Sequence, residues 1–384
     1  MNLYYWAPFL SNVATVKAVL NSATGVKKYS KNIKPHIINA VGEWSVFEKN
    51  IKNKGINLIS FKKGSSFYEK LPRYSFFKSR FSYLLISLVT FFKLYKFFKS
   101  KKENDFIILH LITSLPLLII LLFNFKCKFI LRISGFPKLN FFRKLLWKLC
   151  NKKLYLVSTP TKDTKEMLVR NKIFSEKITF LLRDPIISIS EINLKKKEKI
   201  EDFFDKNEFI VNAGRLTSQK NQKFLIDGFS LIKKKYSNLK LLILGDGELD
   251  NYLKFYAKKL NLENDIYFLG HKDNVFKYYK KSICFILTSR WEDPGFVLIE
   301  AAAAKTPIIS SDCKNGPKEF INNEQRGYLF RNYDLKSFEN KFSEFMNDKK
   351  KNKDKLNTKI LHAFKEVKKF TNFSHLRDLL KIIN

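Results

Sequence analysis

The sequence predicts an α/β fold in two domains, each built around a parallel sheet. The chain has 384 residues, which is long enough for two hydrophobic cores. Apolar runs fit for buried strands recur along it, and several lead through a turn into a helical pattern. A repeated strand, turn and helix is the unit of a parallel α/β sheet. Such sheets place their ligands at the carboxyl ends of the strands.

The most informative segment covers residues 289–304. An apolar run fit for a strand precedes it, and Pro294-Gly295 marks a turn within it. The residues from Val297 to Ala304 strongly favour a helix. Free amides at the start of that helix would bind a phosphate, whereas Glu292 and Glu300 would accept hydrogen bonds from hydroxyls. Phosphate together with a polyol indicates a sugar nucleotide. There are two alternatives without a function. A glutamate early in a helix can simply complement the helix dipole, and Glu292 can be a solvated loop residue.

A second strand-turn-helix unit begins at Phe209. Its strand ends at Gly214, and its helix is expected over residues 221–235. Arg215 and Lys220 would project from the connecting loop, where a guanidinium and an ammonium together suit a pyrophosphate. Two basic residues near a turn mean little by themselves in a chain with 72 Lys and Arg. Their position at the carboxyl end of a strand favours the functional interpretation.

A third unit leads from the apolar run 239–244 into Gly245-Asp-Gly247. The third glycine of a dinucleotide-binding fingerprint is missing. Asp265 lies at about the right distance downstream, but it precedes the next strand instead of ending it. A dehydrogenase is therefore disfavoured.

Together these residues resemble the family-4 retaining glycosyltransferases of the GT-B fold. The resemblance is strong over residues 209–330 and weak elsewhere, and the run 312–319 is similar to bacterial enzymes that build surface polysaccharides. It rests on motifs whose order and spacing are specific in combination: Gly214-Arg215, Lys220-Asn221, Gly245-Asp-Gly247, Phe268-Leu-Gly270, Glu292 with Glu300, Thr306-Pro307, residues 312–319 and Gly327-Tyr-Leu-Phe330.

This resemblance implies two Rossmann-like domains that face a central cleft, with a C-terminal helix crossing back to the first domain. The acceptor-binding, membrane-facing domain is expected over residues 1–190 and the donor-binding domain over 207–363. The charged stretch 191–206 is the expected linker, and residues 364–384 are the expected returning helix.

The resemblance also implies roles for the donor side. Arg215 and Lys220 would neutralise the diphosphate as it leaves, Glu292 would bind hydroxyls of the transferred sugar, and Glu300 would hold the ribose. These enzymes retain anomeric configuration and need no metal or cofactor, and the sequence shows no convincing metal-ligand cluster. For His271, a solvated loop position is the alternative to a place near the base. The expected donor-binding residues are Gly214, Arg215, Lys220, Gly245, Gly247, His271, Gly295, Phe296, Val297 and Glu300.

The acceptor side departs from the family pattern. Many relatives carry adjacent glycines after the first strand, where this chain has Ser11 and Asn12, which are hydrogen-bonding candidates or a helix N-cap. Relatives often place a histidine where this chain has Ser134. His110 follows an earlier strand and is either an acceptor contact or a core histidine. The base that deprotonates the acceptor is unassigned, and in retaining members the donor phosphate is often thought to serve.

The formal charge is +37, and it is uneven. Residues 1–190 contain 34 Lys and Arg against 9 Asp and Glu. Lysines alternate with Phe and Tyr over Arg73 to Lys102, which suits an anionic membrane surface. A compositional bias and nucleic-acid binding are the alternatives, and no nucleic-acid motif accompanies the charge. The run 106–125 has the length of a membrane span, but it divides into strand, turn and helix, so attachment without spanning is expected.

The four cysteines show no paired spacing, and no signal peptide is evident, which is typical of a reducing cytoplasm. Together with the basic first half, this predicts a peripheral protein on the inner face of the cytoplasmic membrane. There it would move a hexose-type sugar from a nucleotide diphosphate to a lipid-linked or polysaccharide acceptor. A nucleotide-sugar epimerase or hydrolase of the same fold is one alternative. A basic membrane- or nucleic-acid-binding protein on a degenerate scaffold is another.

Overall fold

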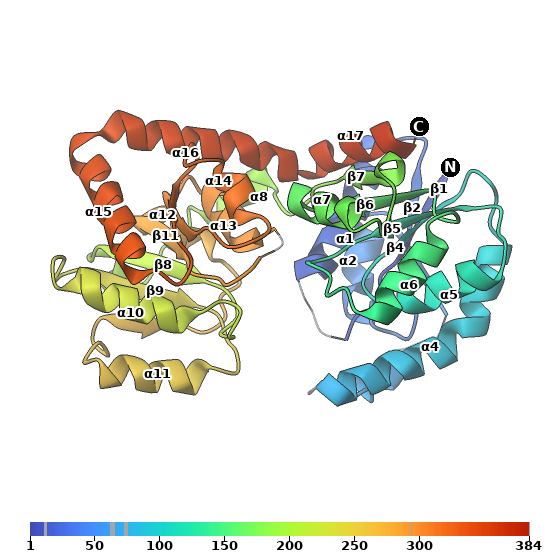
Figure 1. Ribbon diagram of the computed structural model, residues 1–384, viewed down its shortest axis with the longest axis horizontal. Helices are drawn as coiled ribbons and strands as arrows, with labels where there is room; N and C mark the ends of the chain where they lie inside the picture. The colour runs from blue at the N-terminus through green and yellow to red at the C-terminus, as the bar shows by residue number, and fades with distance from the viewer. Residues whose placement is uncertain (11–13, 62–65, 73–75, 293, 384) are drawn as a thin grey trace. The chain divides into compact units, whose positions relative to one another are not determined.

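The computed structural model describes residues 1–10, 14–61, 66–72, 76–292 and 294–383, which form two compact units (Figure 1). The first unit consists of Met1–Ile186 with the C-terminal segment from Asn372, and the second of Ile187–Thr371. Residues 191–206, expected as a linker, lie in the second unit. Two contacts explain this placement: Tyr278 donates a hydrogen bond to Glu201 at 2.8 Å, and Asn274 donates one to the Lys195 carbonyl at 2.9 Å.

The first unit is built on a parallel sheet that has seven strands among the described residues. Its strand order reverses between β1 and β4, which pair in register with Trp6 opposite Leu109. The strands in the middle of the sheet are mostly buried, as expected where helices cover both faces, whereas the edge strand Asn57–Ser60 has no buried residue. In order across the sheet they are β3 (Asn57–Ser60), β2 (Lys34–Asn39), β1 (Asn2–Trp6), β4 (Phe106–Leu109), β5 (Lys128–Arg132), β6 (Leu156–Thr159) and β7 (Thr179–Leu181).

Helices flank this sheet, which lies between α17 at the top and α4 at the bottom of Figure 1. The segment 106–125 divides into strand β4 and helix α5, as predicted. The helices of the first unit are α1 (Ala14–Tyr29), α2 (Glu48–Asn53), α3 (Ser66–Glu69), α4 (Phe76–Lys99), α5 (Ser114–Leu122), α6 (Phe141–Cys150), α7 (Lys162–Arg170) and α17 (Asn372–Ile383), with 3₁₀ turns η1 (Ser45–Phe47) and η2 (Glu176–Ile178).

The second unit repeats the same plan with six parallel strands among the described residues. Its strand order reverses between β8 and β11, where Cys284 pairs with Ile210 and Phe285 with Val211. In order across the sheet the strands are β10 (Ile266–Phe268), β9 (Lys240–Leu244), β8 (Phe209–Ala213), β11 (Cys284–Leu287), β12 (Ile308–Ser311) and β13 (Tyr328–Phe330).

Aromatic side chains fill much of the core that joins these strands to α10 and α15, with Phe229, Phe338 and Phe342 fully buried. The expected helix after Lys220 is α10, which begins at Gln222. The helices of the second unit are α8 (Ile189–Lys195), α9 (Asp202–Asp205), α10 (Gln222–Lys233), α11 (Asp250–Lys259), α12 (Phe276–Lys281), α13 (Phe296–Ala303), α14 (Pro317–Ile321), α15 (Leu335–Lys351) and α16 (Lys353–Val367), with the 3₁₀ turn η3 (Lys368–Phe370).

The C-terminal region, expected as one helix over residues 364–384, is divided at Thr371. Helix α16 and turn η3 belong to the second unit, whereas α17 packs against α1 in the first unit. The amide of Ile187 donates to the Phe370 carbonyl at 3.0 Å, which holds the extended backbone at the bend. Gly25 of α1 allows the close approach of α17, because a Cβ atom there would lie 3.0 Å from the Asn372 carbonyl oxygen.

Candidate active site

The donor-side residues of the second unit gather at the carboxyl edge of its sheet. The loops after β8 and β11 leave the sheet at the point where its strand order reverses. In open α/β sheets, ligands bind in the crevice at such a switch point, because the connections on its two sides turn to opposite faces. The predicted residues Gly214, Arg215 and Lys220 lie on the first loop, and Glu292 and Gly295 lie on the second.

A buried ion pair joins these two loops. The Nζ atom of Lys220 lies 2.5 Å from Oε1 of Glu292, and the two side chains are 14% and 6% exposed. The Ser289 hydroxyl donates to the same Oε1 at 2.6 Å. Backbone contacts support the pair, because the Arg290 amide donates to the Gln219 carbonyl at 2.8 Å. The site therefore presents one ammonium and one carboxylate as a preformed unit.

The loop after β9 packs directly on the loop after β8, and glycine makes this possible. A Cβ atom at Gly245 would lie 2.1 Å from the Gly214 carbonyl oxygen, and one at Gly247 would lie 2.3 Å from the Leu216 carbonyl oxygen. The amide of Leu216 in turn donates to the Asp246 carbonyl at 2.9 Å. The predicted Gly245 and Gly247 thus let two loops share one edge of the sheet.

The remaining donor-side predictions are more exposed. Arg215 follows Gly214 with an exposed side chain, and His271 is exposed in the loop after β10. The Nε2 atom of His271 lies 3.6 Å from Asp273, and its amide donates to Asp246 at 3.0 Å. Both side chains are therefore exposed at the carboxyl edge of the second sheet, with the loop after β9 between their loops.

Helix α13 begins beside the ion pair, with Gly295 as its N-cap in a left-handed conformation at φ 86°. Phe296 and Val297 form its first turn and are partly buried. Glu300 is partly buried one turn further along. Burial, with a contribution from the charge of Glu300, raises the pKa of the Tyr279 hydroxyl well above its usual range.

Ser289 was not among the residues predicted from the sequence, although the serine stands three positions before Glu292. Thr288 was not predicted either; its hydroxyl donates to the Lys220 carbonyl at 3.1 Å and fixes the loop that bears the lysine. Both residues directly follow β11, so the position of polar side chains after a buried strand was the available signal. Among the described residues, no group of three or more His, Cys, Asp or Glu side chains is arranged to hold a metal ion.

On the first unit, the structure brings two of the predicted acceptor-side residues together. His110 follows β4 and Ser134 follows β5, and the Ser134 hydroxyl lies 2.8 Å from Nδ1 of His110. His110 is buried, and burial with the positive charge of Arg132 lowers its pKa well below the usual value. The histidine is therefore neutral near pH 7. Ser11 and Asn12 lie outside the described residues.

An open cavity of about 500 Å³ lies beside Ser134 at the carboxyl edge of the first sheet. Residues 8–10 after β1 and 111–114 after β4 form part of its wall, so it also occupies a switch point. Tyr83 of α4 lines the rest together with five residues of α6 and its N-cap: Asn140, Phe142, Arg143, Leu146 and Trp147. This volume is typical of a small-molecule site.

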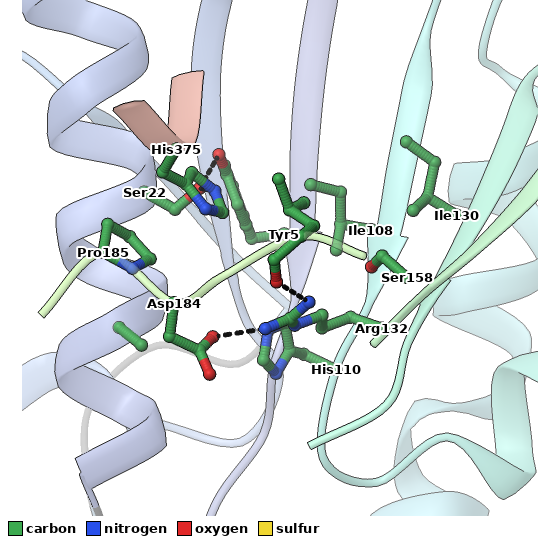
Figure 2. A pocket seen from close by; sticks show the side chains of 12 residues that line it. Tyr5, Ser22, Ile108, His110, Ile130, Arg132, Ser158, Asp184, Pro185 and His375 are labelled. Atoms are coloured by element: carbon green, nitrogen blue, oxygen red, sulfur yellow. Dashed lines mark hydrogen bonds and ion pairs between the residues drawn. The ribbon is translucent and has the colours of Figure 1, made fainter. Parts of the chain in front are cut away.

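A polar network lies next to His110 inside the first unit. Figure 2 shows His110 beside Arg132, whose guanidinium donates to Asp184 at 2.7 Å. On the other side of the same small cavity, Ser22 lies 2.8 Å from Nε2 of His375. Nδ1 of His375 donates to the Arg183 carbonyl at 2.7 Å, so helix α17 is attached to the first unit through a neutral imidazole.

Comparison with known proteins agrees with this architecture. Residues 194–359 match the family model described as glycosyl transferases group 1. Solved structures with two parallel-sheet domains match the whole chain. They include a glycosyltransferase from Rickettsia africae at a TM-score of 0.74 and 18% identity, covering 100% of this chain and 97% of that one. The Anabaena protein HepE in complex with UDP matches at a TM-score of 0.73 and 15% identity, covering 99% of each chain. The fold is therefore GT-B, and the matched part of the second unit is similar to the glycosyl transferases of group 1.

Two curated relatives come from Campylobacter jejuni. A 4-alpha-N-acetylgalactosaminyltransferase whose name includes a diphospho-undecaprenol acceptor is 34% identical over 186 residues, which are 48% of this chain and 49% of the relative. An alpha-1,4-N-acetyl-D-galactosaminyltransferase named for a PP-undecaprenol-linked acceptor is 27% identical over 343 residues, which are 86% of this chain and 90% of the relative. An uncharacterized glycosyltransferase of Methanocaldococcus jannaschii is 39% identical, with 44% of this chain and 40% of the relative aligned. The chain thus spans about half or less of two of these relatives.

Proposed function

We propose that the protein is a retaining glycosyltransferase that moves a hexose-type sugar from a nucleotide diphosphate to a lipid-linked acceptor in surface-glycan synthesis. The observation on which this rests is the Lys220–Glu292 ion pair at the switch point of the second unit. A cation and a carboxylate held together there match the two chemical parts of a sugar nucleotide, the phosphates and the hydroxyls.

In this proposal, Lys220 and Arg215 neutralise the charge that develops on the diphosphate as the sugar leaves. An ammonium has three donors, so Lys220 keeps its bond to Glu292 while it donates to a phosphate oxygen. Preorganised charges of this kind are often the largest contribution to catalysis. Transfer then needs neither a metal ion nor a cofactor, because the two side chains supply the positive charge.

Glu292 would bind the transferred sugar. Its contacts with Lys220 and Ser289 both end on Oε1, and a carboxylate has a second oxygen that can accept a sugar hydroxyl. Glu300, one turn into α13, would accept hydrogen bonds from the ribose. The backbone of Gly295, Phe296 and Val297 lies at the start of the same helix, and His271 on the β10 loop would approach the base.

Two comparisons support the substrates. The structure of the similar Anabaena protein holds UDP, which favours a nucleotide donor. The two C. jejuni relatives are named for acceptors linked to undecaprenol through a diphosphate, which favours a lipid-linked acceptor. An acceptor of that kind is found at a membrane. We therefore place the protein on the inner face of the cytoplasmic membrane, where the basic and aromatic helix α4 would contact anionic lipid.

Purified protein would be screened with UDP- and GDP-sugars for thermal stabilisation, and the stabilising donor then incubated with polyprenyl-diphosphate-linked glycans. We expect a product that is one hexose heavier by mass spectrometry, with the anomeric configuration of the donor by NMR. Activity should persist in EDTA. The matched control is Lys220→Met, which removes the ammonium and nearly keeps the side-chain volume.

Other outcomes would contradict the proposal. Turnover of the donor at an equal rate with and without acceptor would indicate an epimerase or hydrolase. Inversion at the anomeric carbon would exclude the retaining assignment. Binding to membranes or nucleic acid with no response to any sugar nucleotide would indicate a binding protein on a degenerate scaffold.

A further inference from the structure

Three neighbouring helices of the first unit expose apolar side chains on their outer faces. On α4, Phe81, Leu84, Leu88 and Phe92 are more than half exposed and recur every three or four residues, so they form one stripe. Helix α5, which packs against α4 and α6, exposes Leu118 and Leu122. Helix α6 exposes a third set: Phe141, Phe142, Leu145 and Leu149. We call the exposed apolar residues of α4, α5 and α6 the three-helix face.

The opposite side of α4 packs along its length against the first unit. Ser82, Ile86, Thr90, Leu94 and Phe98 recur every four residues and are fully buried. Among the described residues, Lys78–Lys99 has the length and mean hydropathy, 1.4, of a membrane-spanning helix. Because its inner stripe is packed, α4 would have to leave the unit in order to cross a bilayer. The exposed stripe instead fits a helix that lies in the membrane surface.

The charged residues of these three helices have one sign. Helices α4, α5 and α6 contain no Asp or Glu, whereas α4 has basic residues near both ends and α6 has three: Lys78, Arg80, Lys93, Lys96 and Lys99 in α4, and Arg143, Lys144 and Lys148 in α6. Contiguous exposed apolar surface on a soluble protein marks an interaction site. Apolar side chains bordered by Lys and Arg fit an anionic lipid surface, where the stems lie along the apolar region and the charges meet phosphates.

The cavity of about 500 Å³ lies between α4 and α6, so it borders the three-helix face. Arg143 of α6 lines it, donating from one nitrogen to the Lys138 carbonyl at 2.6 Å and keeping further donors. Partial burial lowers the pKa of the Arg143 guanidinium, and the positive charge of nearby Arg80 adds to this effect. A guanidinium at the wall of an open cavity favours an anion, and phosphate suits its planar donor geometry.

We propose that this cavity binds the phosphate of a lipid-linked acceptor at Arg143, while the three-helix face lies in the bilayer that contains the lipid. This gives the acceptor class of the proposed function a specific place on the first unit. Its sugar would extend past Ser134, which lines the same cavity. The name acceptor rests on the proposed function, whereas binding of the lipid phosphate does not.

The phosphate site is tested by flotation with vesicles in the absence of any sugar nucleotide. One set contains a polyprenyl diphosphate, and a second contains the same polyprenol with phosphatidylglycerol added to equal surface charge. We expect the protein to bind the first set about tenfold more tightly, as for one additional charge-assisted contact. Arg143→Gln should remove this preference and leave binding to the second set unchanged. The matched control Arg170→Gln, at the exposed end of α7, should keep the preference.

Three results would overturn the phosphate site: equal binding to both sets, an unchanged preference in Arg143→Gln, or complete displacement by inorganic pyrophosphate in modest excess. The last would show a site for free phosphate, since the bilayer should favour the lipid-linked form. Binding of the lipid diphosphate without any sugar transfer would support the phosphate site and refute the proposed function.

The three-helix face is tested separately with Leu145→Ser combined with Leu149→Ser. Both side chains are exposed, so we expect the variant to fold and to lose binding to both vesicle sets by about tenfold or more. Phe255→Ser, which removes an exposed aromatic side chain of α11 in the second unit, is the matched control. Unchanged binding by the double variant, or an equal loss in the control, would show that the face does not contact the bilayer.

Discussion

Lys220 and Glu292 form an ion pair with 2.5 Å between Nζ and Oε1, although the sequence assigns them to different parts of a sugar nucleotide. Each charge makes burial of the other tolerable, because an isolated charge with little exposure is costly. The pair also holds the loop after β8 against the loop after β11. Binding chemistry and loop geometry therefore depend on the same contact.

The first prediction concerns stability. Lys220→Met leaves the Glu292 carboxylate with the Ser289 hydroxyl as its remaining described partner, so we expect the free energy of unfolding to fall by about 2 kcal/mol. Glu292→Gln should lower the free energy of unfolding by less, because it leaves an ammonium on the more exposed of the two side chains. The double variant should lower it by less than the sum of the two single losses. Urea denaturation of all four proteins measures the coupling, and strictly additive losses would contradict it.

The second prediction concerns the leaving group. Arg215 is exposed and lies on the same loop as Lys220, so Arg215→Ala should leave the fold intact. We expect it to reduce kcat/KM by an amount equivalent to about 2–4 kcal/mol, as for loss of one preorganised charged contact. Arg170→Ala on the first unit serves as the control, since it removes the same charge from an exposed helix end. Unchanged transfer by Arg215→Ala would refute its assigned role.

The third prediction separates the two carboxylates of the β11–α13 segment. Glu300→Ala should weaken binding of the free nucleoside diphosphate, because its proposed partner is the ribose. Glu292→Ala should retain most of that affinity and mainly slow transfer, because its proposed partner is the sugar. Calorimetry with UDP or GDP and steady-state kinetics distinguish them. The opposite pattern would mean that the two roles are exchanged.

The architecture of the second unit was largely predictable from local patterns. The apolar run before Ser289 is β11, the helix after Gly295 is α13, and Gly245 and Gly247 lie where two loops pack closely. These features depend on neighbours in sequence. The ion pair between Lys220 and Glu292 depends on which strands are adjacent, and the sequence does not show that β8 lies beside β11.

Exposure was the other feature that local patterns left open. The sequence shows Phe and Lys alternating along α4, but not that Ile86 and Leu94 face the unit while Leu84 and Leu88 face outward. The apolar face of α6 was missed altogether, because its Phe and Leu residues are as consistent with a core helix. The bend at Thr371 was missed for a similar reason, since it is fixed by a contact with distant Ile187.

The fourth prediction concerns pH and the attachment of α17. Burial lowers the pKa of His375 from 6.5 to about 4, while its bond to the Arg183 carbonyl opposes this shift. Among the surrounding groups, Arg132 lowers the pKa of His375, and Asp184 and Asp378 raise it. The unfolded chain therefore binds a proton more readily than the folded one between these pH values. Stability from the neutral imidazole is complete above pH 6.5 and is lost as the pH falls towards 4, by up to about 3 kcal/mol.

Urea midpoints at neutral pH and near pH 5 measure this loss, with fluorescence as the signal because Trp6, Trp44 and Trp147 all lie in the first unit. His375→Asn keeps a donor for the Arg183 carbonyl but cannot titrate, so its midpoint should fall less on acidification. Buried His110 remains in that variant, and a smaller pH dependence should therefore persist. His362→Asn, which changes an exposed histidine of α16, should behave as the wild type. An equal acid-induced shift in wild type and His375→Asn would show that the imidazole of His375 does not control the attachment of α17.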